Sequence, residues 1–126
     1  MLTIRTAQLQ TLSQLAFERG AQGHVARYFP RHVAAMGPEA TLQAVRAAHE
    51  TAARLGFREE REISHFIDLS FMFGPDFHAN PLHAWAAGIL ADRAITDPRH
   101  RMARLYEAAL GHLRRLAAAS EAVQGV

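Results

Sequence analysis

Asp76, His78 and His83 lie within eight residues of one another and are the residues whose types come closest to a metal site. Imidazole and carboxylate together are a common ligand set for zinc or iron. Their spacing matches no established ligand motif, so they converge on one ion only if the chain folds back between them. A small helical metal- or haem-binding protein that uses the histidines of residues 76–83 is therefore the alternative hypothesis. The main hypothesis needs no metal and no cofactor.

Two further sets of polar residues have a spacing that metal binding or catalysis can use. Glu62 and His65 match the Glu-x-x-His element of di-iron bundles, but the chain lacks the second copy that such a centre needs. The close set of residue types suited to acid–base or nucleophilic catalysis is Ser64, His65, Asp68 and Ser70. His65 and Asp68 are neighbours at three-residue spacing on one predicted helix, whereas Ser70 lies elsewhere on it. No nucleophile elbow, glycine-rich phosphate loop or paired-acid motif accompanies them. We therefore predict no catalytic residue and a protein that is not an enzyme.

The lack of cysteine and the position of several glutamates argue against other classes of protein. The chain has no cysteine, so disulfides, thiolate zinc sites, iron–sulfur clusters and cysteine nucleophiles are excluded. Residues 52–57 resemble the turn of a helix-turn-helix, but the next helix opens with Glu59, Glu60 and Glu62, whose charges repel phosphate. The arginines of the last predicted helix lack interleaved aromatic residues. Nucleic acid is therefore not an expected partner.

A short aromatic loop is the expected binding site. Gly74-Pro75 and Asn80-Pro81 bound it, since each pair favours the end or the start of a helix. A small bundle needs Trp85 and the phenylalanines of the preceding helix in its core. Phe77 lies between two polar residues, and we expect its ring to point outward, where an aromatic side chain can anchor a protein interface. Phe77→Ala is then expected to cost less stability than Trp85→Ala while weakening a partner contact.

The elements that must position this loop are helices. Apolar residues recur at three- and four-residue spacing, and no stretch alternates over a full strand length. Prolines and glycines place the helices at about residues 6–29, 38–55, 59–73, 81–90 and 98–119. The chain is predicted to be an all-α, single-domain bundle of about five helices over residues 1–120. Residues 121–126 are expected to form a frayed tail.

The same periodicity gives each helix an apolar stripe. Leu9 and Leu12 belong to the stripe of the first helix, and Leu113 and Leu116 belong to that of the last. Leu82 is expected on the inner face of the fourth helix.

Charge is distributed unevenly along the 126 residues. The net charge is +3 over residues 1–37, −4 over residues 38–92 and +3 over residues 93–126. Such a split can draw the ends onto the middle within one fold or present a polarised surface to a partner, and we favour the internal or solvated explanation. No segment approaches the roughly 18 apolar residues of a membrane span, and the start has no run that fits a signal peptide. A cytoplasmic protein without a membrane partner is expected.

Residues 69–77, 80–81, 85–86 and 101–106, with the opening Leu2-Thr3-Ile4-Arg5, form a pattern that covers most of the chain. This pattern resembles small uncharacterised all-helical proteins encoded near bacterial type VI secretion spike and effector components. The chain has His78 and Asn80 where those proteins carry acids, so no role for acids is carried over. The resemblance implies an accessory role in effector handling, as an adaptor or as an immunity protein.

The main hypothesis is therefore a non-enzymatic protein-binding accessory factor, linked to a type VI secretion system, whose partner is a secretion spike or effector component. A homodimer and the oligomeric state are left open. The expected partner-binding residues are Pro75, Asp76, Phe77, His78, Asn80 and His83.

Overall fold

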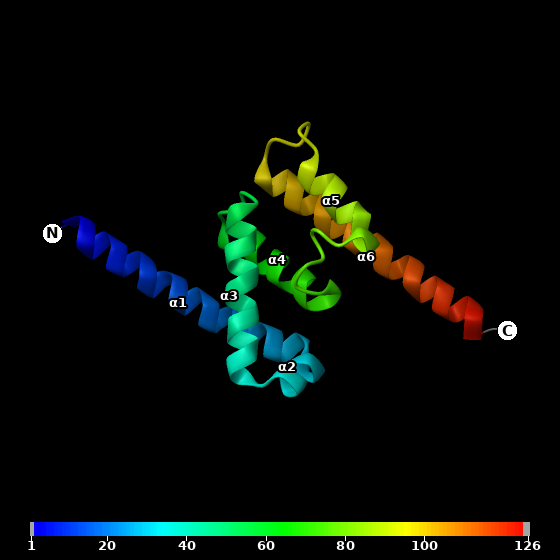
Figure 1. Cartoon of the computed structure of the whole chain (residues 1–126), viewed down its shortest axis with the longest axis horizontal. Helices are drawn as coiled ribbons and strands as arrows, with labels where there is room; N and C mark the ends of the chain where they lie inside the picture. The colour runs from blue at the N-terminus through cyan, green and yellow to red at the C-terminus, as the bar shows by residue number, and fades with distance from the viewer. Residues whose placement is uncertain (1, 125–126) are drawn as a thin grey trace.

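The computed structural model describes residues 2–124 and is built from helices (Figure 1). They are α1 (Leu2–Tyr28), α2 (Pro30–Met36), α3 (Pro38–Arg54), α4 (Glu60–Phe73), the 3₁₀ turn η1 (Pro81–His83), α5 (Ala84–Ala91) and α6 (Pro98–Gln124). No strand occurs within residues 2–124, so the prediction of an all-α single-domain bundle is confirmed, with six α-helices in place of about five. Over the same residues, every helix is too short or too polar to span a membrane.

The first predicted helix, residues 6–29, corresponds to α1, and the short helix α2 that follows it is not among the predicted helices. Phe29 leaves the helical conformation with φ −129° and ψ 56°, and Pro30 opens α2. Pro30 thus follows the end of α1 and also opens a further helix, because proline suits the first position of a helix, where its missing N–H needs no partner. α2 contains no buried residue, so it lacks the apolar face from which a helix can be recognised.

In the second half of the chain, η1 and α6 begin at Pro81 and Pro98, as predicted, with two differences. The Asn80 carboxamide oxygen accepts a hydrogen bond from the N–H of Leu82 at 3.0 Å and so caps a 3₁₀ turn, not an α-helix. Leu82 is 81% exposed because this turn places it off the inner face of α5, so its predicted inward position is wrong. α6 extends to Gln124, so the predicted frayed tail is helical that far. Met1 of the predicted domain and residues 125 and 126 of the predicted tail lie outside the described residues.

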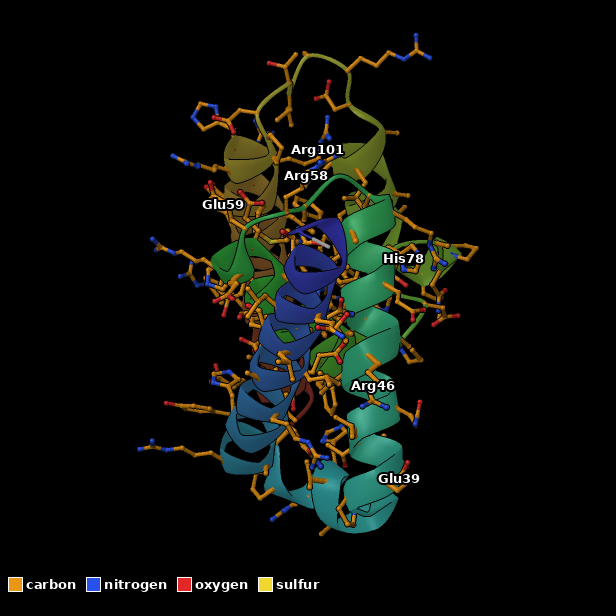
Figure 2. All side chains as sticks on the ribbon, turned by 90° about the vertical axis from the view of Figure 1, so that its left-hand side faces the viewer. Glu39, Arg46, Arg58, Glu59, His78 and Arg101 are labelled. Atoms are coloured by element: carbon orange, nitrogen blue, oxygen red, sulfur yellow. The ribbon has the colours of Figure 1, made fainter. Side chains whose placement is uncertain are left out.

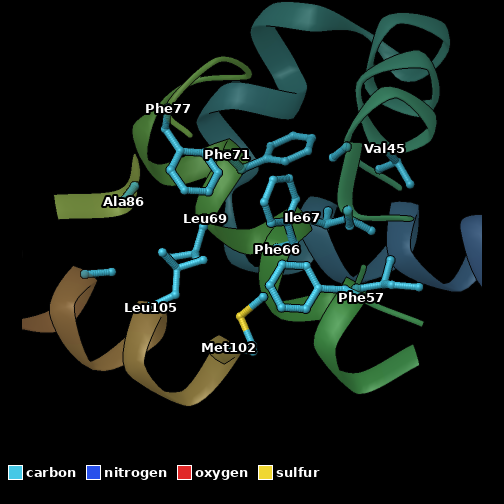
Figure 3. Packing of buried hydrophobic residues seen from close by; sticks show 14 of the residues in the cluster. Val45, Phe57, Phe66, Ile67, Leu69, Phe71, Phe77, Ala86, Met102 and Leu105 are labelled. Atoms are coloured by element: carbon cyan, nitrogen blue, oxygen red, sulfur yellow. The ribbon is translucent and has the colours of Figure 1, made fainter. Parts of the chain in front are cut away.

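The core forms around α4, as its nearly all-round apolar sequence predicts. Phe66 is fully buried, and its ring centroid lies 6.1 Å from that of Phe57 and 5.1 Å from that of Phe77 (Figure 3). Met102 and Leu105 of α6 close the opposite side of this cluster. The last helix is therefore held to the body through its first three turns.

A buried carboxylate holds α1 against α3. Glu18 is 2% exposed and accepts hydrogen bonds from Nε of Arg46 at 3.4 Å and from Nδ1 of His49 at 3.2 Å (Figure 2 shows Arg46 on α3). Phe17 packs its ring edge against His49, with centroids 5.3 Å apart. The contacts of α1 with the body thus begin near its middle, and the helix before Phe17 extends away from it (Figure 1).

Gly74 ends α4 in a conformation that only glycine adopts easily. Its φ is 106° and its ψ is 157°, and a Cβ added there would meet Asp76 Oδ1 at an ordinary 3.6 Å, so backbone strain and not space is the obstacle. We expect Gly74→Ala to lower the free energy of unfolding by about 1–3 kcal/mol, as measured by urea denaturation. Gly88→Ala is the matched control, because Gly88 is helical and an added Cβ meets nothing within 4 Å. Equal effects of the two substitutions would contradict the strain at Gly74.

Candidate functional site

Phe77 points into the core, so the prediction that its ring faces outward is wrong. The residue is 0% exposed, and its ring stacks on Trp85 and lies beside Phe66 and Phe73, with centroids 6.4, 5.1 and 6.4 Å away. A tight turn causes this orientation, because the N–H of Phe77 donates to the carbonyl of Gly74 at 3.2 Å. Asp76 is exposed and His78 is half-buried, while the ring of Phe77 between them turns inward.

The other predicted partner-binding residues lie at different depths. Pro75 and Asp76 are exposed, Asn80 is used in the η1 cap, and His78 is half-buried with its ring 6.0 Å from that of Phe66. His83 packs its ring against Phe73 at 5.3 Å. Of the six predicted partner-binding residues, Pro75 and Asp76 alone are exposed. A partner-binding role of these residues stays a prediction.

The structure adds a residue to the surroundings of His83 that the sequence did not indicate. His112 of α6 lies 5.7 Å from His83 between ring centroids, and both rings also pack against Phe73 and Trp85. These four rings join η1 and α5 to the middle of α6. Nδ1 of His83 and Nε1 of Trp85 are enclosed and have no hydrogen-bond partner. The cluster therefore packs the loop onto α6.

The residues of the metal alternative do not form a ligand set. Within residues 2–124, no group of three or more histidine, aspartate, glutamate or cysteine side chains is placed to hold a metal ion. His78 packs toward Phe66, whereas His83 packs toward Phe73 and His112. The Glu62 and His65 pair likewise gains no further ligand among these residues.

An apolar groove of about 270 Å³ lies beside the predicted loop and between α2, α3 and the end of α4. Met36 and His32 line it from α2, and Pro75 forms part of its edge. The remaining lining residues are mostly small or apolar: Ala44, Ala47, Ala48, Thr51, Ser70, Phe71, Met72 and Gly74. Pro75 is thus a predicted partner-binding residue that borders this groove.

The apolar surface that faces solvent is concentrated at the two ends of the chain. We define the N-terminal arm as residues 6–16 of α1 and the C-terminal arm as residues 110–122 of α6. Among the described side chains, nine large hydrophobic ones are exposed, and six of them are arm leucines: Leu9, Leu12, Leu15, Leu110, Leu113 and Leu116. The arms project from opposite sides of the body (Figure 1). The apolar stripes found in the sequence are therefore present, and the described residues leave these leucines 38–65% exposed.

Comparison with protein-family models, with curated proteins and with solved structures finds no match to this chain.

His24 lines a second pocket, of about 230 Å³, between α1 and α4, and pairs with Asp68 of α4. Nε2 of His24 and Oδ1 of Asp68 are 2.9 Å apart, and Ser64 lines the same pocket as His24. Burial raises the pKa of Asp68, and the charge and hydrogen bond of His24 offset part of that rise. No hydrogen bond joins Ser64 to His24 among the contacts described, so the pair links two helices and does not complete a nucleophile–base set.

Ionisation of Asp68 should destabilise the fold. Because the pKa of Asp68 is raised in the folded state, its contribution to stability is full below the ordinary value of 3.8 and is lost as pH rises through the folded pKa. In a His24→Gln background, which removes the imidazole, the stability of the Asp68→Asn variant relative to the protein that keeps Asp68 should therefore increase as pH rises from 3 to 7. Urea denaturation across that range measures the difference, and a difference that stays constant or changes in the opposite direction would contradict the account.

Proposed function

We propose that this chain is a non-enzymatic, cytoplasmic accessory factor that binds a partner protein through its N-terminal and C-terminal arms. One observation carries the proposal, namely the six exposed leucines on two helical arms that project from the body. Every side chain of residues 6–16 is exposed, and so is every side chain of residues 113–122.

The exposed apolar faces of the arms support this proposal. Each arm is the outer part of a 27-residue helix, and most helical stability in proteins comes from the packing of an apolar face. In the N-terminal arm, Leu9 and Leu12 are 65% and 62% exposed and lie three residues apart, so they share one face. In the C-terminal arm, Leu113 and Leu116 repeat this spacing and are 38% and 53% exposed. Paired leucines at helical spacing are the type of anchor that a helix presents to an apolar groove or to another helix.

The identity of the partner is proposed from the sequence resemblance alone. Proteins with a similar pattern are encoded near type VI secretion spike and effector components, so we propose such a component as the partner. An adaptor or effector-handling role fits two arms that leave opposite sides of one body, because each arm can contact a different protein or a different part of one protein.

Affinity purification from cells that naturally make the protein tests the proposal. The wild-type chain is compared with the variant Leu9→Ser, Leu12→Ser, Leu113→Ser and Leu116→Ser, and the recovered proteins are identified by mass spectrometry. We expect the wild type to retain a specific partner that the variant loses. Leu82→Ser is the matched control, since Leu82 is 81% exposed but lies in η1, at the predicted loop. Loss of the partner with Leu82→Ser and its retention by the arm variant would show that the loop, and not the arms, is the binding site.

A further inference from the structure

The start of α4 and the start of α6 enclose a pocket of about 440 Å³ that the arms do not reach. Glu59, Glu62 and His65 line it from the α4 side, and Arg99 and Met102 line it from α6. Figure 2 shows Glu59 together with Arg58 and Arg101 toward one end of the molecule, with Glu39 at the other end. The pocket thus combines carboxylates, arginines and a histidine with an apolar wall at Met102.

Glu62 is the unusual group of this pocket. Its side chain is 95% buried, and Oε1 is enclosed without a hydrogen-bond partner in the described chain. Buried polar atoms nearly always have a partner, and burying a carboxylate oxygen without one costs free energy. Glu62 lies in the first turn of α4, where the helix dipole favours a negative charge. The dipole supplies no donor to Oε1, however, so the carboxylate keeps an unused acceptor.

The cations near this carboxylate are engaged elsewhere or face solvent. Arg99 donates from Nε and Nη2 to Oε1 of Glu59, at 2.9 and 2.6 Å. Arg61 lines the pocket but is exposed. The ring of His65 packs against Tyr106, with centroids 4.8 Å apart. No hydrogen bond from any of these three side chains to Glu62 is among the contacts described.

We propose that this pocket binds a guanidinium group, with its N–H groups donating to the Glu62 carboxylate and its aliphatic stem lying along Met102. A guanidinium presents several donors in a plane and is more weakly hydrated than an ammonium, which suits a carboxylate enclosed at a pocket wall. A metal ion is the less suitable cation, because no group of three or more ligating side chains exists within residues 2–124. The guanidinium comes either from an arginine side chain of a protein or from free arginine. The site is independent of the arm leucines.

Titration followed by ¹H–¹⁵N correlation spectra tests this site at low ionic strength. N-acetyl-arginine amide represents a side chain within a protein, L-arginine represents the free amino acid, and N-acetyl-citrulline amide is the uncharged control. We expect saturable shifts of the amide signals of Glu62, His65 and Met102 with at least one arginine probe and none with the citrulline probe. Binding of the blocked probe alone indicates a protein side chain, and binding of L-arginine alone indicates the free amino acid.

Two variants make the test specific to one carboxylate. Glu62→Gln keeps the shape of the side chain and should weaken binding about tenfold or more, which corresponds to about 1.4 kcal/mol. Glu60→Gln removes the same charge from an exposed position one residue from the pocket-lining Arg61 and should leave the affinity nearly unchanged. The wild-type comparison of arginine and citrulline probes needs no variant, so the proposal stays testable if Glu62→Gln folds poorly. Equal binding of the two kinds of probe, no saturable shift with either arginine probe, or wild-type affinity in a folded Glu62→Gln protein would each overturn it.

Discussion

Phe77→Ala is expected to lower the free energy of unfolding by about 3–5 kcal/mol, the range for removal of a fully buried aromatic ring. The ring is 0% exposed and contacts aromatic side chains from α4 and α5, so its loss leaves a cavity where the loop meets the core. A domain of this size is stabilised by only about 5–15 kcal/mol, so the variant should lose a large part of its stability. Urea denaturation of the purified protein measures the change.

The matched comparison is with Trp85→Ala and Asp76→Ala. Trp85 is half-buried and its indole nitrogen has no hydrogen-bond partner, so its removal should cost no more than the removal of Phe77. If Phe77 pointed outward, Phe77→Ala would instead cost less stability than Trp85→Ala. Asp76 is exposed, and its replacement should change stability by no more than about 0.5 kcal/mol. A change below about 1 kcal/mol for Phe77→Ala would contradict the buried position of the ring.

Replacing the four arm leucines with serine is expected to abolish partner binding with little loss of stability. Burying a leucine contributes about 1.5–3 kcal/mol relative to leaving it exposed. The four side chains are 38–65% exposed in the free protein, so part of this contribution is available to a partner. We expect the affinity to fall about a hundredfold or more, which corresponds to about 3 kcal/mol. Isothermal titration calorimetry with the purified partner measures the change.

Two further measurements distinguish a loss of partner binding from unfolding of the variant. The variant should keep the thermal midpoint of the wild type to within a few degrees, because the core lies around Phe66 and does not include the four leucines. Two double variants show which arm contributes more to partner binding. One combines Leu9→Ser with Leu12→Ser, and the other combines Leu113→Ser with Leu116→Ser. A quadruple variant that is as stable as the wild type and binds with unchanged affinity would contradict the role of the arms.

Much of the fold could be predicted because glycine, proline and capping residues act locally. Pro38 after Gly37 opens α3, and the carboxylate of Asp97 caps α6 by accepting from the N–H of Arg99 at 2.9 Å. Pro30 correctly indicates the end of the first helix, but the seven-residue α2 that it opens is too short to show a helical periodicity.

The candidate sites were harder to predict because they depend on tertiary packing. The polar neighbours of Phe77 favour an outward ring, but the turn from Gly74 directs it inward. The periodicity of Leu9 and Leu113 correctly indicates apolar helix faces, yet a stripe does not reveal whether the same chain covers it. Glu18 and Glu62 are both buried acids, and only the structure shows that Glu18 has partners whereas Oε1 of Glu62 has none.

Site-specific photo-crosslinking in cells tests the role of the arms most directly. A photoreactive phenylalanine derivative replaces Leu12, Leu116, Leu82 or Glu50, which represent the two arms, the predicted loop and the exposed surface of α3. The account predicts that positions 12 and 116 each crosslink to a protein other than this chain, whereas positions 82 and 50 do not. Crosslinks from position 82 alone, crosslinks only between copies of this chain, or no crosslinks from either arm would contradict it.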